Sequence, residues 1–308
     1  MKEKITVFGS FNVDLMGRAP HLPVPGETVK GGLFRQGPGG KGFNQAVAAH
    51  KAGGEVAVIA KLGRDPLAQI ALQTMDELSV PKEHLLFDET QPTGTALIMV
   101  DDRTAENMIM IEPGANDTIS DADLAGVADA IKSSAYLLLQ LEINQDANER
   151  AAAIAKANGV RVILNLAPYQ PVSDEFLRGA YLVTPNEVEA EELTGIAIKD
   201  LASADRAAAV FFSKGVQNVI ITLGSRGVYL NDGKSSQIVP AYRVDAIDTT
   251  GAGDAFNGGL IAALAEGKSL PQAVGFANAL AALSVQRLGT TTSMPTREEI
   301  DRFLAERT

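Results

Sequence analysis

Short, largely apolar runs alternate with longer helical patterns along this chain, and this alternation limits the possible folds more than any other feature. The runs predict buried strands at Ile5–Phe8, Val56–Ala60, Tyr136–Leu139, Val160–Leu164, Tyr181–Val183 and Val219–Leu223. The helical patterns cover Asn44–Ala52, Leu67–Leu78, Ala147–Ala157, Ala204–Lys214 and Pro271–Arg287. Strands that alternate with helices predict an α/β fold, in which a mostly parallel sheet is covered by helices on both faces.

Two segments interrupt this alternation. Residues 13–36 contain prolines and glycines without a helical period, and Thr95–Val100 and Asn107–Ile111 flank an acidic turn in the manner of a β-hairpin. Strands without intervening helices suggest a small separate sheet, and structured long loops are often active-site covers. We therefore expect a single domain over residues 1–308, with a β lid formed by about residues 13–36 and 94–112.

Composition excludes several classes of function. The 308 residues include no cysteine, which rules out disulfides, thiolate metal sites and a cysteine nucleophile, and the formal net charge of −11 argues against a nucleic-acid partner. The amino terminus lacks the pattern of a signal peptide, and no apolar stretch reaches the roughly 18 residues of a membrane span. We expect a cytoplasmic protein without a membrane partner.

The strongest chemical signal is Asp248–Phe256, with the sequence DTTGAGDAF. Gly251 and Gly253 precede the helical run Ala255–Ala265, and successive backbone N–H groups at such a turn can bind an anion such as phosphate. The Asp254 carboxylate would repel phosphate, but it makes chemical sense as a base that takes a proton from a hydroxyl attacking phosphorus. An aspartate that merely caps the helix fits the spacing equally well.

A second glycine-rich segment, Gly39–Asn44, opens an alanine-rich helical pattern. It is not a Walker A loop, because Gly42 occupies the position of the serine or threonine that holds magnesium. Glycines with Lys41 and the Asn44 amide near a helix start suit a ligand with many hydroxyl groups. A tight structural turn explains the same residues equally well.

Asn12 and Asp14 follow the first predicted strand. Two residues apart in an extended segment, their side chains point to the same side and could bind adjacent hydroxyls of a sugar. Considered alone, such a pair is more often a turn former.

Two further segments follow predicted strands. In Thr184–Glu189 the side-chain oxygens of Asn186 and Glu189 lie one helical turn apart and suit hydrated magnesium, although a helix capping box explains them as well. Thr222–Gly227 has two glycines and a cation, which could hold a nucleotide, but on its own it is more typical of a hairpin turn.

In this order, the segments resemble the ribokinase family of carbohydrate kinases. Gly39–Asn44 and Asp248–Asp254 match the two glycine-rich signatures of that family, and Gly26–Thr28 and Leu139–Glu142 also lie at its motif positions. The resemblance implies a Rossmann-like domain with a β-sheet lid, and a homodimer formed through the lid. It implies that ATP phosphorylates a sugar, with the 5-hydroxyl of D-ribose as the expected acceptor; 2-deoxyribose, fructose or a nucleoside are the alternatives.

The resemblance also implies roles for individual residues. Asp254 would be the catalytic base, and the anion hole would consist of Gly251, Ala252 and Gly253. The sugar would be bound by Asn12, Asp14, Gly40, Lys41, Asn44, Glu142 and Asp254. ATP would be bound by Asn186, Thr222, Gly224, Gly227, Gly253 and Asn278. Mg²⁺ would lie near Glu189. K⁺ would be held by Asp248, Thr250, Ser284, Arg287, Gly289 and Ser293.

Two other classes of function are less consistent with the sequence. A sugar sensor without activity would lack the base or the anion hole, yet Asp254, Gly251 and Gly253 are all present. A nicotinamide-dependent oxidoreductase would carry a GxGxxG sequence after the first strand, which the residues from Gly9 onward do not provide. The sequence therefore predicts an enzyme.

Overall fold

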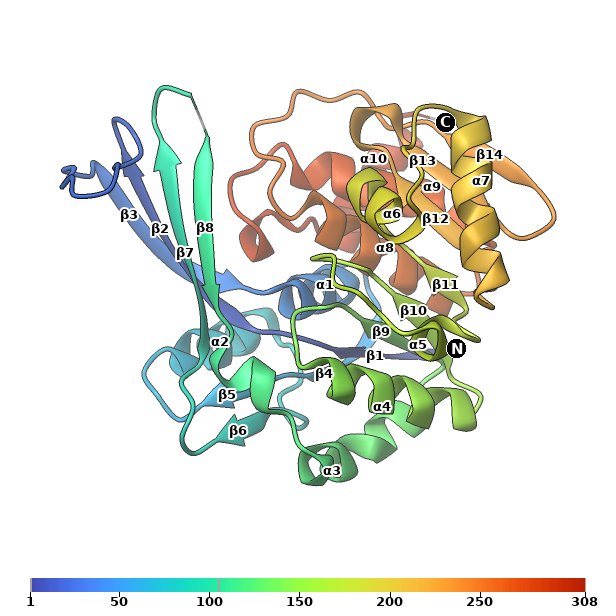
Figure 1. The fold of residues 1–308 in the computed structure, drawn as a ribbon, viewed down its shortest axis with the longest axis horizontal. Coiled ribbons are helices and arrows are strands. Elements are labelled where there is room, and N and C mark those ends of the chain that lie inside the picture. Colours follow the sequence, from blue (N-terminus) through green and yellow to red (C-terminus); the bar gives the residue numbers. More distant parts are fainter. Residues whose placement is uncertain (1, 105, 308) are drawn as a thin grey trace.

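The computed structural model describes residues 2–104 and 106–307, which form three β-sheets with helices packed around the largest one (Figure 1). The strands are β1 (Lys4–Phe8), β2 (Asn12–Ala19), β3 (Leu33–Gly39), β4 (Glu55–Ile59), β5 (Lys61–Gly63), β6 (Leu86–Asp88), β7 (Gly94–Asp101), β8 (Asn107–Glu112), β9 (Tyr136–Leu139), β10 (Arg161–Leu164), β11 (Leu182–Val183), β12 (Val219–Thr222), β13 (Val228–Asn231) and β14 (Ser236–Val239). The α-helices are α1 (Lys41–Lys51), α2 (Ala68–Leu78), α3 (Asp121–Lys132), α4 (Gln145–Ala157), α5 (Asp174–Leu177), α6 (Glu187–Thr194), α7 (Leu201–Ser213), α8 (Ala252–Ala265), α9 (Leu270–Ser284) and α10 (Arg297–Ala305). Three short 3₁₀ helices are η1 (Gly114–Thr118), η2 (Gly224–Arg226) and η3 (Thr291–Ser293).

The main sheet has eight strands in the order β14-β13-β12-β11-β10-β9-β1-β4. The six strands from β12 to β4 are parallel, and β13 and β14 continue the sheet in antiparallel fashion. Side chains alternate between two apolar cores: Val7 and Leu138 lie in one, Phe8 and Leu139 in the other. Helices α1, α2, α8, α9 and α10 contribute to the first core, and α3 to α7 to the second. The predicted α/β class is confirmed.

The predicted strands of the main sheet agree with the structure to within one residue at each end, whereas the helix ends differ more. Helix α1 begins at Lys41 rather than at Asn44, because Gly40 adopts a φ of 88° as its N-cap directly after β3. The helix expected over Pro271–Arg287 ends at Ser284.

The second sheet has the order β3-β2-β7-β8 and stands beside the main body of the molecule in Figure 1. Its base is formed where β2 begins, since Asn12 pairs with both Gly39 and Gly94. Strands β7 and β8 form an antiparallel hairpin. Several large apolar side chains of this sheet are exposed: Leu33, Phe34, Leu97, Met99, Met108, Ile109, Met110 and Ile111.

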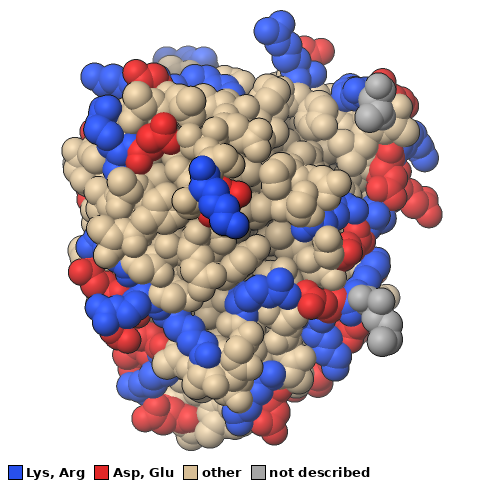
Figure 2. All heavy atoms as spheres, turned by 90° about the vertical axis from the view of Figure 1, so that its right-hand side faces the viewer, with Lys and Arg blue, Asp and Glu red and all other residues tan. Residues whose placement is uncertain are grey.

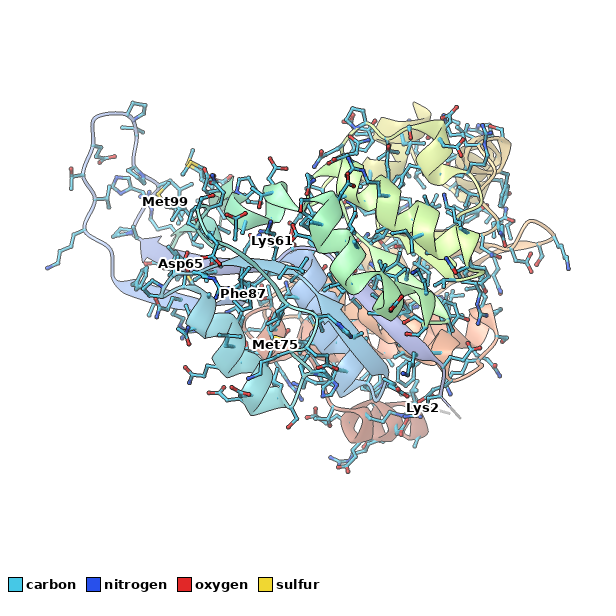
Figure 3. The ribbon with its side chains drawn as sticks, turned by 90° about the horizontal axis from the view of Figure 1, so that it is seen from below. Lys2, Lys61, Asp65, Met75, Phe87 and Met99 are labelled. Atoms are coloured by element: carbon cyan, nitrogen blue, oxygen red, sulfur yellow. The ribbon has the colours of Figure 1, made fainter. Side chains whose placement is uncertain are left out.

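A third sheet, formed by β5 and β6, supports the base of the second one. Here the buried Lys61 ammonium, seen from below in Figure 3, donates to Asp123 Oδ2 at 2.9 Å and to the Thr118 carbonyl at 2.8 Å. Asp88 Oδ2 lies 3.2 Å from the same nitrogen. This ion network ties η1 to the main body of the protein.

On the face drawn in Figure 2, basic and acidic side chains are interspersed. Among the residues that the structure describes, no helix is both long enough and apolar enough to cross a membrane.

Candidate active site

Asp254 lies in the first turn of α8, and its carboxylate is buried. The N-cap of α8 is Gly251, with a φ of 76°, so Asp254 does not cap the helix. Its two oxygens instead accept hydrogen bonds from α1: Asn44 Nδ2 lies 3.1 Å from Oδ2, and Gln45 Nε2 lies 2.9 Å from Oδ1. The interpretation of Asp254 as a helix cap is therefore wrong.

Burial raises the pKa of Asp254 above its usual value, and the nearby charge of Glu142 adds to this effect. Lys41 and the hydrogen bonds from Gln45 and Asn44 act in the opposite direction but do not cancel the effect of burial. A carboxylate whose pKa is raised is a better proton acceptor than an exposed one.

The start of α1 brings a cation next to this carboxylate. The backbone N–H of Lys41 donates to Glu142 Oε2 at 2.8 Å, and the Ser10 hydroxyl donates to the same oxygen at 2.5 Å. A Cβ on Gly42 would lie 2.6 Å from the backbone of residues 9 and 10, so only glycine permits this close approach of α1 to the end of β1.

Lys41 is surrounded by acidic groups. Burial alone would lower the pKa of Lys41, but the negative charges of three carboxylates outweigh burial and hold it above its usual value. These carboxylates belong to Asp254, Glu142 and Glu189. Within the described residues, the Lys41 ammonium makes no hydrogen bond or ion pair, and these carboxylates act on it only through longer-range attraction. It is therefore available to a ligand.

Asn12 and Asp14 project from β2 into the same region. Burial, together with the charges of Glu142 and Asp254, raises the pKa of Asp14 to about 7. The Asp14 carboxylate lies across Gly39, where a Cβ would be 2.2 Å from Oδ1. Asn12 is buried, and its Oδ1 accepts a hydrogen bond of 2.9 Å from Asn116 Nδ2.

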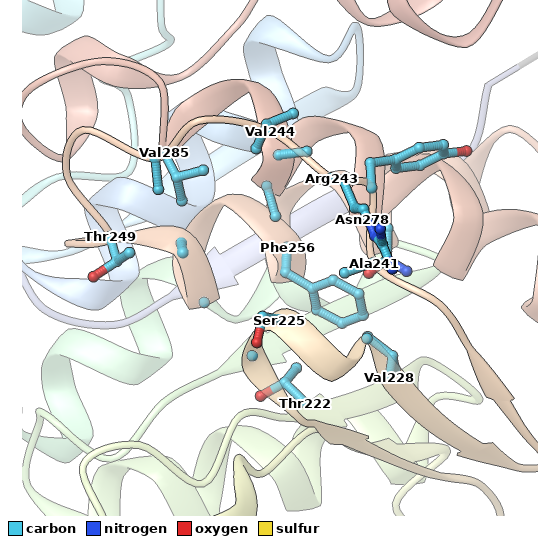
Figure 4. A pocket seen from close by; sticks show the side chains of 18 residues that line it. Thr222, Ser225, Val228, Ala241, Arg243, Val244, Thr249, Phe256, Asn278 and Val285 are labelled. Carbon is cyan, nitrogen blue, oxygen red and sulfur yellow. The ribbon is translucent and has the colours of Figure 1, made fainter. Parts of the chain in front are cut away.

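A cavity of about 430 Å³ opens beside the amino-terminal end of α8 (Figure 4). Most of its wall is apolar, with Val228, Phe256 and Val285 among its side chains. Its size and lining are typical of a small-molecule site. Five of the residues predicted to contact ATP line it: Thr222, Gly224, Gly227, Gly253 and Asn278. The sixth, Asn186, is not in the wall but forms a β-bridge with Thr222.

Asn186 and Glu189 form a capping box at the start of α6. The Asn186 N–H donates to Glu189 Oε2 at 2.8 Å, and the Glu189 N–H donates to Asn186 Oδ1 at 2.9 Å. Burial raises the pKa of Glu189, although the Asn186 N–H and the Lys41 charge act against burial. The helix capping box that the sequence analysis left open is thus present. Glu189 also interacts electrostatically with Lys41 and Asp254.

The residues predicted to hold potassium lie around the loop that precedes α8. Asp248 Oδ1 accepts from the Thr250 N–H at 2.9 Å, and Oδ2 accepts from the Gly289 N–H at 3.0 Å. Burial would raise the pKa of Asp248, but these N–H donors outweigh it and lower the pKa. An ionised carboxylate therefore joins two loops.

The remaining three residues of this set use their side chains within the protein. The Ser284 hydroxyl donates to the Ala281 carbonyl at 2.9 Å, and the Ser293 hydroxyl donates to the Thr290 carbonyl at 2.7 Å. Arg287 is paired with Glu299 at 2.5 Å. Across the described residues, no group of three His, Cys, Asp or Glu side chains is arranged to hold a metal ion.

Sequence reasoning missed four buried amides at this site. Gln45 Nε2 donates to Asn165 Oδ1 at 2.9 Å as well as to Asp254. Asn257 Nδ2 donates to the Gly253 carbonyl at 2.9 Å, and Asn116 contacts Asn12. Gln45 was detectable as a polar residue in an alanine-rich helix, and Asn257 contacts Gly253 one helical turn away. The partners of Asn116 and Asn165 at this site are too distant in sequence to predict.

Comparison with known proteins gives consistent results. A family model described as pfkB family carbohydrate kinase matches residues 2–297. The chain is 42% identical over 304 residues to a protein named Ribokinase from Haemophilus influenzae, covering 99% of both chains. It is 33% identical over 302 residues to a Deoxyribokinase from Salmonella typhi, covering 98% of both. The structure of Arabidopsis thaliana ribokinase complexed with ribose and ATP superimposes with a TM-score of 0.91 at 32% identity, covering 99% of both chains.

Proposed function

Because this chain belongs to the pfkB family of carbohydrate kinases, we propose that it transfers the γ-phosphate of ATP to the 5-hydroxyl of D-ribose. One observation carries the proposal. The Asp254 carboxylate lies in the first turn of α8, and the polar groups of Asn12, Asp14 and Lys41 converge on the same region. A base, a helix amino terminus and polar groups suited to hydroxyls are the parts that phosphoryl transfer to a sugar requires.

In the reaction, the 5-hydroxyl oxygen of the sugar bonds to the γ-phosphorus, and the bond from phosphorus to the β,γ-bridging oxygen breaks to release ADP. Asp254 accepts the hydroxyl proton as the new bond forms. The backbone N–H groups of Gly251, Ala252 and Gly253 stabilise the charge on the transferring phosphoryl group, and the dipole of α8 adds to this stabilisation.

We assign the sugar to the region between β2 and α1. Asn12 and Asp14 would bind neighbouring hydroxyls, and Lys41 would donate to the sugar from the start of α1. Gly40, with a φ of 88°, lets the start of α1 pack on β2, because a Cβ there would lie 2.8 Å from the Asn12 nitrogen; we assign its backbone to the sugar site. Asn44 and Glu142 complete the set of polar groups.

We assign ATP to the cavity beside α8. The apolar wall suits the adenine ring, and the position of Gly253 in that wall would place the phosphates at the helix amino terminus. Mg²⁺ keeps several waters and is usually bound through one or two carboxylates and the phosphates, which Glu189 fits because only its Oε2 is used by the capping box.

The loops around Asp248 fit a monovalent cation, since an ionised carboxylate and neighbouring backbone oxygens are hard ligands. Bound K⁺ would supply positive charge that orders the loop before α8. Thr250, Ser284, Arg287, Gly289 and Ser293 would then act through backbone or hydroxyl oxygens, and K⁺ would not contact the substrate.

We also propose that the second sheet is a lid that closes over the sugar and pairs with the lid of a second copy in a homodimer. The exposed apolar side chains of β3, β7 and β8 support this, because monomeric proteins rarely expose a large contiguous apolar surface to solvent. We expect the enzyme to work in the cytoplasm, where ATP is available.

The 2-deoxyribose alternative has one specific observation in its favour, the 33% identity to a Deoxyribokinase. Asn12 and Asp14 argue for ribose, because a site that hydrogen-bonds a hydroxyl discriminates against a sugar that lacks it. The test is a comparison of kcat/KM for ribose, 2-deoxyribose, fructose and adenosine, with ATP, Mg²⁺ and K⁺ present. Ribose is expected to give the highest value, and a higher value for any other acceptor would contradict the proposed substrate.

A further inference from the structure

We propose that Asn116 is a positioning residue for sugar specificity, because it fixes which end of the Asn12 amide faces the sugar. The inference rests on the proposed function and concerns the same site. Asn116 lies in η1, between the end of the second sheet and α3, and its side chain is buried.

The backbone of Phe11 sets the orientation of the Asn116 amide without ambiguity. The Phe11 N–H donates to Asn116 Oδ1 at 3.0 Å, and Asn116 Nδ2 donates to the Phe11 carbonyl at 2.9 Å. A backbone N–H can only donate and a carbonyl can only accept, so the oxygen and nitrogen of Asn116 cannot be exchanged.

The fixed Asn116 amide in turn fixes the orientation of the Asn12 amide. The same Asn116 Nδ2 donates to Asn12 Oδ1 at 2.9 Å, so Asn12 must present its oxygen to Asn116 and its Nδ2 in the other direction. If the Asn12 amide turned over, two NH₂ groups would face each other where both side chains are at most 3% exposed. A buried donor without an acceptor loses the hydrogen bond it makes in water, which disfavours the turned-over amide.

The backbone of Gly94 lies against the contact between Asn116 and Asn12. A Cβ at this position would lie 2.3 Å from both Asn116 Nδ2 and Asn12 Oδ1. The backbone of β7 therefore packs directly on the amide pair and leaves no room for water between them.

Asn12 Nδ2 has no hydrogen-bond partner among the described residues, and Asp14 follows two residues later on the same side of β2. Gly39 pairs with Asn12 and also lies under the Asp14 carboxylate, so that carboxylate leans back toward Asn12. A hydroxyl between them could accept from Asn12 Nδ2 and donate to Asp14. A C–H group at the same place could do neither, which favours ribose over 2-deoxyribose.

Hydrogen bonds on both sides of Asn116 fix the position of η1 and therefore of the Asn116 amide. The Ala115 N–H donates to the Pro92 carbonyl at 2.8 Å, and the Thr118 hydroxyl donates to Asp88 Oδ2 at 2.7 Å. The Lys61 network anchors the Thr118 carbonyl. Thus η1 is tied on both sides of Asn116.

The test is the ratio of kcat/KM for ribose to kcat/KM for 2-deoxyribose. In Asn116→Ala, the Asn12 amide is free to rotate, and the ratio should fall by about three- to tenfold, the equivalent of one ordinary hydrogen bond. Asn116→Asp should give the same fall, because it keeps an acceptor for the Phe11 N–H but has no donor for Asn12. In an Asn12→Leu background, Asn116→Ala should leave the ratio unchanged, since the two residues act through one contact.

The matched control is Asn148→Ala in α4, another buried asparagine, whose Nδ2 donates to the Gln140 carbonyl at 2.7 Å. It should lower the melting temperature and leave the ratio unchanged. An unchanged ratio in folded Asn116→Ala and Asn116→Asp, with both sugars losing activity equally, would make Asn116 merely structural and overturn the inference. A wild-type protein inactive on both sugars would instead overturn the proposed function, and this inference with it.

Discussion

Two amides from α1 hold the Asp254 carboxylate, and their own partners determine their direction. The Thr291 hydroxyl donates to Asn44 Oδ1 at 2.7 Å, which turns Asn44 Nδ2 toward Asp254. Gln140 Nε2 donates to Gln45 Oε1 at 2.7 Å and turns Gln45 Nε2 the same way. The donors stabilise the ionised form, so they limit the rise in pKa that burial causes.

We therefore expect Gln45→Met to shift the acidic limb of the kcat profile to higher pH. Without this donor the pKa of Asp254 rises further, so activity is lost more at pH 6 than at pH 8. The charged groups around the carboxylate stay as they are: Lys41, Glu142, Asp14 and Glu189.

Gln140→Met should move the acidic limb in the same direction but less, because Gln140 acts on Asp254 only by orienting Gln45. Asn148→Ala is the control, because this buried amide is bonded to the Gln140 backbone and not to Gln45, and it should leave the acidic limb unmoved. An unmoved limb in Gln45→Met would show that Gln45 only supports the fold.

Asp14 illustrates a functional residue that costs stability. Its pKa is about 7 in the folded protein and 3.8 in the unfolded chain. The unfolded chain releases this proton first, so the folded state loses stability as the pH rises from 3.8 to about 7. Asp14→Asn removes the buried charge. Its free energy of unfolding relative to wild type, measured without sugar, should therefore increase between pH 5 and pH 8. An increase of at least about 1.4 kcal/mol corresponds to one pKa unit. A difference that is constant with pH would contradict the raised pKa.

The residues that sequence motifs brought forward lie together, but the contacts that orient them were not predictable. Lys41, Asn44 and Asp254 stand in glycine-rich signatures, where backbone geometry leaves a visible pattern. Asn116 and Gln45 act through contacts with residues 105 and 209 positions away. No local pattern records such partners, so only the folded chain reveals them.

Helices α1 and α8 must approach closely for the base to meet its donors. Gly258 in α8 permits this, because a Cβ there would lie 2.4 Å from Ala48 Cβ and 2.6 Å from the Gln45 carbonyl. The two helices carry opposite halves of the site, Lys41 to Gln45 on one and Asp254 on the other. Their spacing therefore determines the geometry of the carboxylate.

Gly258→Ala should lower both the melting temperature and kcat, because it forces the two helices apart. Gly275→Ala in α9 is the matched control: no heavy atom lies within 4 Å of its Cβ position, so alanine should stabilise the helix by about 0.5–1 kcal/mol. Thermal unfolding and steady-state kinetics of both variants test this. Equal behaviour of the two would show that helix spacing at Gly258 is unimportant.

The elements differed in how well the sequence predicted them, for a physical reason. Strands such as β9 are buried on both faces and appear as continuous apolar runs. Strands β2 and β3 are only partly buried and contain glycine and proline, so their sequence predicts a loop-like lid rather than strands of defined length. Helix α10 was missed because it is short and mostly charged.

At the level of the whole molecule, the uncovered face of the second sheet should determine the oligomeric state. Met110 and Met108 on β8 lie on the same face of this sheet and are 61% and 52% exposed. If two lids pair, Met110→Lys should convert a dimer to a monomer, because an ammonium cannot be buried there without a partner. Ile238→Lys on β14, at the far edge of the main sheet, is the control and should remain a dimer. Light scattering after size exclusion gives the mass, and a wild-type monomer would contradict lid pairing.

The most direct test of the account is the turnover of Asp254→Asn with ribose and ATP. Asparagine keeps the size of the side chain but cannot take a proton, so kcat should fall by about 10²–10⁴-fold. The backbone N–H groups at Gly251–Gly253 remain, so the dissociation constants of ribose and ATP should stay within a few-fold of wild type. A variant that retains wild-type kcat would contradict the assignment of Asp254 as the base and the mechanism built on it.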